Sequence, residues 1–319
     1  MTTKKESKFV SLIKSDGFKS LLSSIVSILI GLLVGFIAMV VITMVSPNNS
    51  ISDAFGGLKI MFSGPFSSSV TKYVLSNTGN MVFYAVPLIF TGLSVSIAYK
   101  TGLFNIGAPG QYIMGTIGAL LVALYIPTTT RAAGIGVWFL AVLVGALLGA
   151  LWGMIPGLLK AFFNINEVII CIMTNWIAAN LVTWLFDISN LKNANEAGKI
   201  GYIMPTSKNG VVTPKLGLDK LFPGSQVDMG ILIAILIAVI VYIVLTKTTF
   251  GYELKACGAN RHAAKYAGIK DKRNIVLSMA IAGSLAGGAA ALYWLSGHTE
   301  FYWNTSQTLP AVGFNGIPV

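Results

Sequence analysis

Seven long apolar stretches, separated by short clusters of charged residues, constrain the fold of this chain more than any other feature. Each is about long enough to cross a bilayer, which requires roughly 20 apolar residues. An unpaired backbone amide is costly in hydrocarbon and the stretches lack the alternation of barrel strands, so we expect helices. The sequence therefore predicts an all-α, polytopic transmembrane bundle, with spans at residues 20–45, 81–98, 103–125, 134–159, 168–186, 229–246 and 275–297.

The composition and the placement of charge agree with a membrane location. The 319 residues are 55% hydrophobic and 10% charged, with a mean hydropathy of +0.76, which is too apolar for a soluble domain. A cytoplasmic N-terminus places most of the 22 basic residues inside, including seven between Lys247 and Arg273. Topology thus explains the net charge of +11, and we expect a multi-pass protein of the inner cell membrane with no nucleic-acid partner.

The domain organisation is simple. The first apolar stretch is about twice the length of a signal h-region and no A-x-A site follows it, so no cleavable signal peptide is expected. Residues 1–19 form a cytoplasmic basic arm, either a short amphipathic helix or a disordered tail. Residues 20–319 form one transmembrane domain, with a cytoplasmic loop at 247–273 and an external loop at 187–228 ordered by packing on the bundle. Residues 46–80 are an external connection with room for a short interfacial helix.

Glycines at a four-residue spacing mark a helix-packing seam. Such a spacing lines glycines along one helix face and lets a neighbouring backbone approach closely. We favour packing over a gating role for this face. The glycines are Gly145, Gly149, Gly153 and Gly157, with shorter repeats at Gly31 and Gly35 and at Gly283 and Gly287.

The stretch TGLFNIGAPGQYIMG at 101–115 is the first candidate for a functional segment. It follows the second span and contains four glycines, a proline and two amides. Broken backbone at membrane depth is tolerated only where protein or a water-filled cavity covers it. Two interpretations remain open, a broken or re-entrant segment that lines a solute path and a plain cytoplasmic turn. The candidate path residues are Asn105, Gly107, Gly110 and Gln111.

Amides within the fifth span form the second candidate. Thr174, Asn175 and Asn180 lie inside an otherwise apolar run, where polar side chains need partners or water. They predict either a hydrated interior that suits a polar solute or interhelical hydrogen bonds that hold the bundle. Glu167, at the cytoplasmic edge, is expected to cap the helix start rather than to relay protons.

The cytoplasmic loop at 248–273 is the third candidate. Asn260 is a good N-cap for a helix of about two turns through Ala263 and Ala264, with Gly268 as its C-terminal stop. So short a helix needs a docking partner to be stable. Docking to another protein and a plain positive-inside loop both remain open.

Three motifs together carry a family resemblance. The segments GLFNIGAPGQ at 102–111, NEVIICIMTNWIA at 166–178 and TTFGYELKACGANRHAAKYAGI at 248–269 resemble the permease subunits of ABC importers. Within these, the chain is most similar to the simple-sugar and nucleoside branch of the superfamily that also contains branched-chain amino-acid permeases. The resemblance covers about residue 80 to the end.

The resemblance implies a nucleoside importer in which two permeases form the channel. A cytoplasmic ABC ATPase would use ATP, and an extracytoplasmic solute-binding lipoprotein or protein would deliver the solute. We expect the second permease to be a different chain, and no cofactor on this one. By the same similarity, the loop would carry a coupling helix for the ATPase, and the stretch around Asn105 would lie near the translocation path. The implied coupling residues are Gly251, Gly258, Asn260, Ala263, Ala264 and Gly268.

The chain departs from the family pattern at two places. Pro109 stands where relatives commonly have an acidic residue, so any role of that carboxylate is missing here. The segment GFNGIPV at 313–319 resembles a motif after which relatives continue through further spans, so we expect the natural chain to continue beyond it.

Three other functions compete with a nucleoside importer. The same importer class for a simple sugar remains open, because the binding protein largely sets specificity. An ion-coupled secondary transporter would normally place a carboxylate or histidine deep in a span, and no Asp or Glu lies inside any of the seven stretches. This argues against proton coupling, whereas sodium held by amides and carbonyls remains open. A membrane enzyme would need clustered acids, histidines or cysteines. Cys171 and Cys257 are far apart and imply no disulfide or metal site, and the sequence has no G-x-x-x-x-G-K-S/T motif, so we expect a transport subunit without ATPase activity.

Overall fold

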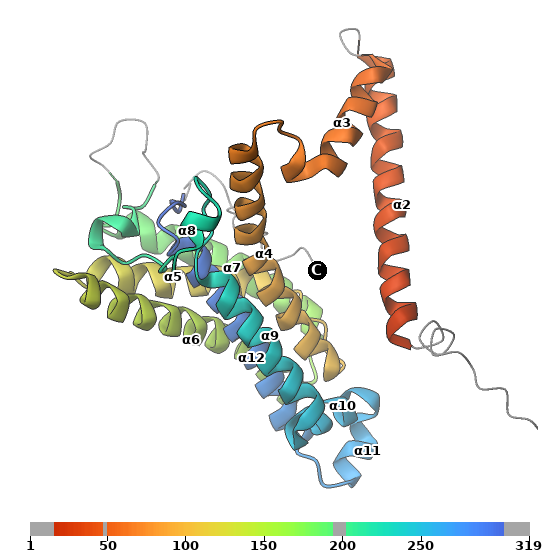
Figure 1. Cartoon of the computed structure of the whole chain (residues 1–319). Coiled ribbons are helices and arrows are strands. Elements are labelled where there is room, and N and C mark those ends of the chain that lie inside the picture. The colour runs from red at the N-terminus through yellow and green to blue at the C-terminus, as the bar shows by residue number, and fades with distance from the viewer. Residues whose placement is uncertain (1–15, 47–49, 194–201, 303–319) are drawn as a thin grey trace, which may run out of the picture. The chain divides into compact units, whose positions relative to one another are not determined.

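The computed structural model describes residues 16–46, 50–193 and 202–302, which form helices joined by short connections (Figure 1). The described part contains no strand, and its β-type pairing is confined to two isolated bridges. The all-α prediction is therefore confirmed. The helices are α2 (Asp16–Val45), α3 (Ile51–Ser63), α4 (Thr71–Lys100), α5 (Ala108–Tyr125), α6 (Arg131–Phe163), α7 (Glu167–Ile188), α8 (Leu218–Leu221), α9 (Gly230–Lys247), α10 (Thr249–Ala259), α11 (Arg261–Tyr266) and α12 (Asp271–Trp294), with 3₁₀ turns η1 (Gly64–Phe66) and η2 (Thr206–Asn209).

Seven of these helices are long and apolar enough to cross a membrane, which confirms the seven predicted spans. They are α2, α4, α5, α6, α7, α9 and α12. The largest difference in boundary concerns α4, which begins at Thr71 and not near Met81. Its first turns are polar, so hydropathy missed them, and they bind a distant loop instead. Ser76 Oγ donates to the carbonyl of Gly224 at 3.0 Å, and Asn80 Oδ1 accepts from the amide of Gln226 at 2.8 Å. The prediction of a connection at 71–80 was wrong.

The described chain divides into two compact units, residues 1–70 and 71–319. In the first unit, α2 is apolar on every side, and the ring of Phe36 lies 5.1 Å from that of Phe55 in α3. A capping box begins α3, because Ser50 and Asp53 bind each other's backbone amides. This confirms a short helix in the 46–80 connection. The predicted basic arm lies largely outside the described residues, and the single domain at 20–319 stays a prediction.

In the second unit, α5 and α12 are the most buried spanning helices (Figure 1). The helices α4, α6 and α7 pack around them, and α9 packs on α4. Both central helices are rich in Gly and Ala, which allows neighbouring helices to approach closely. The core therefore depends on close backbone contact rather than on large side chains.

The predicted glycine seam joins α6 and α12, which run antiparallel. A Cβ on Gly149 would lie 2.3 Å from the carbonyl oxygen of Gly283, and a Cβ on Gly153 would lie 2.4 Å from that of Met279. Seen from α12, a Cβ on Gly287 would meet the carbonyl oxygen of Gly145 at 2.3 Å. The packing interpretation is confirmed, while Gly31 and Gly35 have open space around them.

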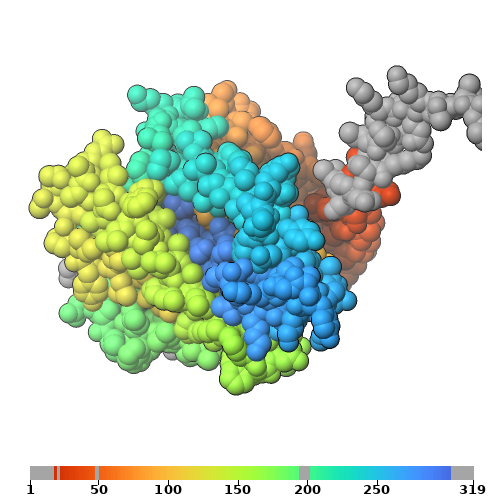
Figure 2. All heavy atoms as spheres, turned by 90° about the horizontal axis from the view of Figure 1, so that it is seen from below, coloured from red at the N-terminus to blue at the C-terminus, as the bar shows by residue number. Residues whose placement is uncertain are grey.

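Successive spanning helices run in opposite directions, so the connections of the second unit gather at two ends. We call them the loop end, with residues 126–130, 189–193, 202–229 and 295–302, and the basic end, with residues 101–107, 164–166 and 248–270. Figure 2 views the basic end, where α10 and α11 (blue) stand beside the ends of α6 and α7 (green) with a hollow between them.

The described parts of the loop at 189–229 lie on the bundle as expected. Asn209 Nδ2 donates to the carbonyl of Leu124 at 2.9 Å, which ties η2 to the end of α5. Trp138 Nε1 in α6 donates to Thr213 Oγ1 at 3.0 Å, and the Thr213 amide donates to the carbonyl of Leu295 at 2.8 Å. Packing on three helices thus orders a segment whose own helices are only single turns.

Candidate functional site

The segment between α4 and α5 is irregular and carries the first group of predicted site residues. Asn105 and Gln111 are both buried, and their side-chain amides bind each other twice, at 2.9 and 3.0 Å. Asn105 Nδ2 also donates to Ser94 Oγ of α4 at 3.2 Å. These bonds fix the turn against the helix that precedes it. That the segment is re-entrant in the membrane remains a prediction.

Asn175 of α7 binds the same segment from the other side. Its Oδ1 accepts from the amide of Gly110 at 2.9 Å, and its Nδ2 donates to the carbonyl of Ile106 at 3.0 Å. A Cβ on Gly110 would lie 2.7 Å from Asn175 Oδ1 and 3.0 Å from Asn175 Cα, so glycine allows this close approach. A Cβ on Gly107 would lie 3.0 Å from Cys171 Sγ. Five predicted path residues therefore meet in one place, which we call the amide cluster: Asn105, Gly107, Gly110, Gln111 and Asn175.

The amide cluster lies inside the protein at the basic end. Its side-chain amides bind one another, Ser94 and the backbone, so they are committed to holding α4, α5 and α7 together. The amides of α7 were predicted either to face a hydrated interior or to make interhelical hydrogen bonds, and Asn175 does the latter. Thr174 is also buried, and its Oγ1 donates to the carbonyl of Cys171 at 3.0 Å.

Asn180 lies in a different environment. It is exposed on α7, and its Nδ2 donates to the carbonyl of Trp176 one turn earlier at 2.8 Å. Trp176 and Trp184 are exposed on the same face and border it. Together they form an open hollow of about 510 Å³, which we call the α7 hollow, lined by Met173, Trp176, Ile177, Asn180, Leu181 and Trp184. Sequence reasoning selected Asn180 but missed the hollow, although the Trp-x₃-Asn-x₃-Trp spacing places all three on one helix face.

The connection between α9 and α12 contains two helices, of which one was predicted. Asn260 Oδ1 accepts from the amide of Ala263 at 3.0 Å and so begins α11. Gly268 ends it with a φ of +81°, and the amide of Ile269 donates to the carbonyl of Ala264 at 3.0 Å. The predicted cap and stop are confirmed. The preceding helix α10 was missed, although Thr248 caps it by accepting from the amide of Gly251 at 3.2 Å.

The predicted coupling residues divide into buried and exposed groups. A Cβ on Gly251 would lie 2.2 Å from the carbonyl oxygen of Val244, and one on Gly258 would lie 2.4 Å from that of Lys100. These glycines therefore serve contacts within the chain, and Ala264 is buried as well. The exposed members are Asn260, Ala263 and Gly268.

Tyr266 is the most exposed large side chain of α11 and was not selected from the sequence. It is 95% exposed. An aromatic ring of this kind is typical of protein interfaces. The sequence signal was available, because Tyr266 lies three residues after Ala263 and shares its part of the helix surface.

Polar contacts connect both short helices to α12. Arg273 Nη2 and Asn274 Nδ2 donate to Glu253 Oε2 of α10 at 2.9 and 2.8 Å. Arg261 Nε of α11 lies 2.7 Å from Asp271 Oδ2. A movement of α11 would therefore be transmitted to the central helix.

The described residues offer little that could perform catalysis or hold a metal. They contain no group of three His, Cys, Asp or Glu side chains placed to bind a metal ion. Cys171 and Cys257 are free and buried, and burial raises the pKa of Cys257, which keeps its thiol protonated. Glu167 lies in the first turn of α7 and pairs with Lys160 at 2.9 Å. The N-cap is Asn166, whose Oδ1 accepts from the amide of Val168 at 2.9 Å, so the prediction that Glu167 caps this helix was wrong.

Comparison with known proteins places the chain in a family. A family described as branched-chain amino acid transport system / permease component matches residues 77–317. The guanosine ABC transporter permease protein NupP of Bacillus subtilis is 34% identical over 94% of this chain and 78% of its own length. The nucleoside ABC transporter permease protein NupB of Lactococcus lactis is 38% identical over 73% of this chain and 62% of its own length.

A sugar-related protein is also similar. The glucose ABC transporter permease protein TsgB13 of Haloferax volcanii is 30% identical over 92% of this chain and 72% of its own length. No solved structure matches the chain. The matching residues include the irregular segment, the amide cluster, the α7 hollow and both short helices. With its apolar helices, this multi-pass membrane protein belongs to the permease-component family of the branched-chain amino acid transport systems.

Proposed function

We propose that this chain is the membrane-spanning permease subunit of an ATP-driven importer for nucleosides. The observation that carries the proposal is the exposed helix α11, which is anchored to the central helix α12 and presents Ala263 and Tyr266 outward. A separate ABC ATPase would bind this surface. A second permease, expected to be a different chain, and an extracytoplasmic solute-binding protein would complete the transporter.

Energy would enter through the basic end, which the proposal places in the cytoplasm together with the N-terminus. ATP binding and hydrolysis in the partner would displace α11, and the Arg261–Asp271 ion pair would pass the displacement to α12. Because α12 packs on α4, α5 and α6, a small shift there would repack the bundle between two arrangements. Alternating access follows when the two arrangements open to opposite sides of the membrane.

The α7 hollow is the proposed part of the solute path. Two exposed indole rings border Asn180, whose Oδ1 remains able to accept a hydrogen bond. Aromatic rings and an amide can stack on a nucleobase and bind its ring nitrogens. The hollow is open on one side, and a second permease facing α7 would close it. The amide cluster would support this path by holding the start of α7, with Thr174 buried behind it.

The choice of nucleosides over sugars is supported by the names of two relatives. NupP and NupB are named for guanosine and nucleosides, and each is more similar to this chain than the glucose permease TsgB13. Indole rings also stack on sugars, so the α7 hollow alone does not separate the two solute classes.

Uptake measurements test the proposal. Uptake of radiolabelled guanosine, uridine and ribose would be compared between cells with and without this gene. The gene-dependent uptake should be of the two nucleosides and should depend on ATP. The Tyr266→Ala variant should weaken copurification of the ATPase about tenfold or more, because a central aromatic side chain often dominates an interface. Nucleoside uptake should fall with it.

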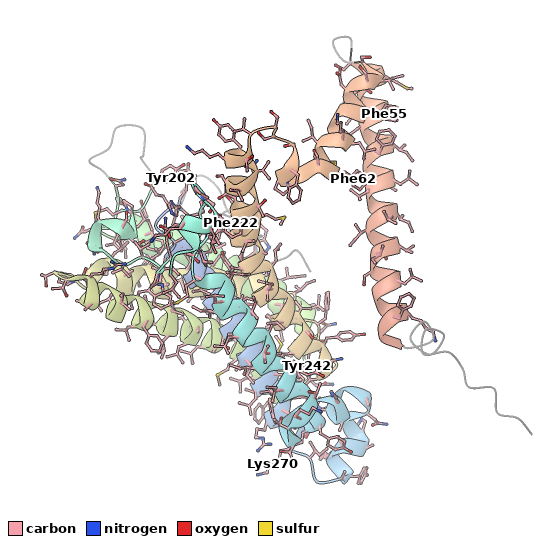
Figure 3. All side chains as sticks on the ribbon, in the orientation of Figure 1. Phe55, Phe62, Tyr202, Phe222, Tyr242 and Lys270 are labelled. Atoms are coloured by element: carbon pink, nitrogen blue, oxygen red, sulfur yellow. The ribbon has the colours of Figure 1, made fainter. Side chains whose placement is uncertain are left out.

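The matched control is Tyr242→Ala, which removes a tyrosine of α9 that is 62% exposed (Figure 3). It should leave the ATPase bound, and both variants should reach the membrane at the level of the unmodified chain. Uptake that survives Tyr266→Ala, or that collapses only when the proton gradient is removed, would contradict ATPase coupling through α11. Gene-dependent uptake of ribose alone would replace the nucleoside by a sugar.

A further inference from the structure

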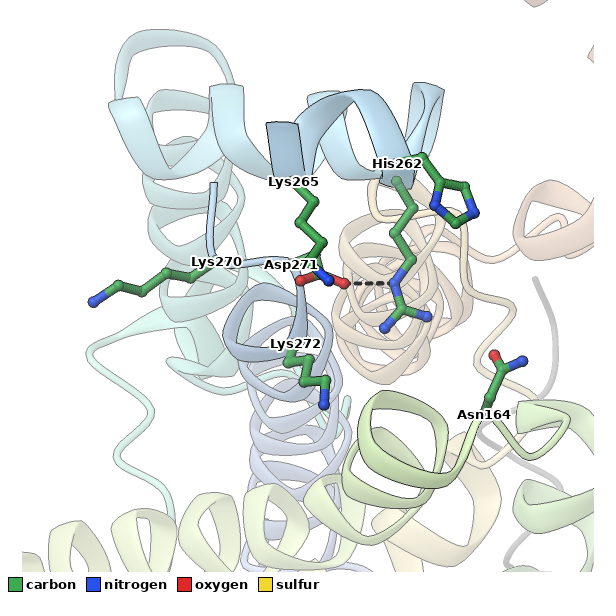
Figure 4. Close-up of a pocket in the computed structure, with 7 residues that line it drawn as sticks. Asn164, His262, Lys265, Lys270, Asp271 and Lys272 are labelled. Carbon is green, nitrogen blue, oxygen red and sulfur yellow. Dashed lines mark hydrogen bonds and ion pairs between the residues drawn. The ribbon is translucent and has the colours of Figure 1, made fainter. Parts of the chain in front are cut away.

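A basic pocket of about 540 Å³ lies at the basic end, beneath α11 and beside the turn from α6 to α7 (Figure 4). Figure 4 shows Lys265 and Lys272 near Asp271, with His262 and Asn164 on the other side and Lys270 pointing away. The proposed transport function uses none of these side chains to bind solute. The pocket is lined by Asn164, Arg261, His262, Lys265, Lys270, Asp271 and Lys272.

The pocket has an excess of positive charge that the described chain does not neutralise. Asp271 is its one acidic lining residue, and this carboxylate is already engaged by Arg261 at 2.7 Å. The nearby basic residues Lys160 and Arg273 have carboxylate partners of their own. In contrast, no salt bridge among the described residues involves Lys265, Lys270 or Lys272. The pocket therefore suits an anion supplied from outside the chain.

The level of the pocket in the bundle favours a lipid as the source of that anion. Asn164 is the C-cap of α6 and Asp271 is the first residue of α12, so the pocket lies where two spanning helices end. This is the level of the phospholipid head groups when the helices cross the hydrocarbon layer. Phe162 and Phe163 are exposed directly beside it. Acyl chains could run along these rings while the head group enters the pocket.

One contact already joins the charged and apolar parts. Lys272 Nζ lies 4.9 Å from the centre of the Phe162 ring, so its ammonium group is held at the border between the pocket and the exposed rings. A phosphodiester at this border would meet Lys272 and Lys265 together, from two different helices.

We infer that the basic pocket binds the head group of an anionic phospholipid, with its acyl chains against Phe162 and Phe163. Basic pockets between helix ends at a membrane surface are suited to such lipids. An acidic surface of the ATPase is the competing occupant. Helical geometry argues against it, because Ala263 lies about 160° around α11 from Lys265, so a partner on the Ala263 face leaves the pocket open.

Lipid retention tests the inference without requiring transport. The full chain would be released from nanodiscs of equal phosphatidylglycerol and phosphatidylcholine, and native mass spectrometry would count the lipids that remain bound. We expect retention of phosphatidylglycerol in preference to phosphatidylcholine. The double variant Lys265→Gln/Lys272→Gln should weaken this binding about tenfold or more, because each basic residue near an anionic lipid contributes appreciably.

The matched control is Lys72→Gln/Lys220→Gln, which removes two positive charges from the first turn of α4 and from α8 and should leave retention unchanged. Equal retention by the Lys265→Gln/Lys272→Gln variant would overturn the inference. Displacement of the lipid by millimolar inorganic phosphate would assign the pocket to a free anion. Loss of ATPase copurification in the Lys265→Gln/Lys272→Gln variant, with unaltered lipid binding, would assign the pocket to the ATPase contact. The lipid measurement does not depend on whether the protein transports nucleosides.

Discussion

At the scale of single residues, Asp228 is the most unusual ionisable side chain outside the membrane-spanning helices. It is 3% exposed at the start of α9, and its Oδ1 accepts from the amide of Gly230 at 2.8 Å. Its Oδ2 has no hydrogen-bond partner within the described residues. Burial raises the pKa of Asp228 to about 7, although the Gly230 amide and the positive charge of Lys215 oppose the shift. The folded protein therefore favours the protonated acid.

The raised pKa makes stability fall as the pH rises. Between about pH 4 and pH 7 the folded chain binds a proton at Asp228 that the unfolded chain releases, so the free energy of unfolding decreases across this window. A difference of about three pKa units corresponds to a few kcal/mol. Asp228→Asn should remove this dependence and raise the melting temperature at pH 8 relative to the unmodified chain. Thermal melts at pH 5 and pH 8 check this prediction, and Asp219→Asn, at an exposed position, is the control. If Asp228→Asn kept the pH dependence of the unmodified chain, ionisation of Asp228 would not be its cause.

The candidate site illustrates what single residues reveal in a sequence. Asn105, Gln111 and Asn175 could be selected because an amide in an apolar run needs a partner. Their partners could not be deduced, since Asn175 binds the backbone of a segment far away in the chain. The spacing of Tyr266 from Ala263 indicates that they share one face of α11, but whether that face is exposed depends on which side of α11 packs on α12.

At the scale of elements, the glycine seam between α6 and α12 determines how closely the central helices approach. Gly149→Ala would place a methyl group 2.3 Å from the carbonyl oxygen of Gly283. Backbone cannot move aside as a flexible side chain can, so the helices must separate, at a cost of about 1–3 kcal/mol. We expect a lower melting temperature and less protein in the membrane.

Gly136→Ala provides the comparison, because it adds the same methyl group to the same helix at a position with open space around it. Its melting temperature should match that of the unmodified chain or exceed it, since alanine is the better helix former. Equal melting temperatures for the two variants would refute close packing at the seam.

The spanning helices were predictable because a bilayer requires long apolar runs. Seven apolar runs identified seven helices, and the four-residue spacing identified the seam. The first turns of α4 were missed because most of their residues are polar, and α10 was missed because its 11 residues mix polar and apolar types. Tertiary contacts rather than lipid stabilise both. Ser76 and Asn80 bind a loop that follows in sequence only after four further helices, which no local pattern can indicate.

At the scale of the whole molecule, the loop end and the basic end differ in charge and in exposed chemistry. The basic end has α11, the basic pocket and the amide cluster, whereas the loop at 189–229 mixes acidic and basic residues. Buried α12 links the two ends directly, so binding events at either end act on one packed core. This division is what a transporter with different partners on its two sides requires.

Orientation in the membrane is the remaining property of the whole chain that an experiment can decide. Positively charged segments are retained in the cytoplasm, so α10 and α11 should face inward and the loop at 189–229 outward. A membrane-impermeant maleimide should therefore label Lys220→Cys in intact cells, and Lys255→Cys only after the membrane is opened. The unmodified chain provides the background, because Cys171 and Cys257 are buried. Labelling of Lys255→Cys in intact cells would invert the topology and place α11 beyond the reach of a cytoplasmic ATPase.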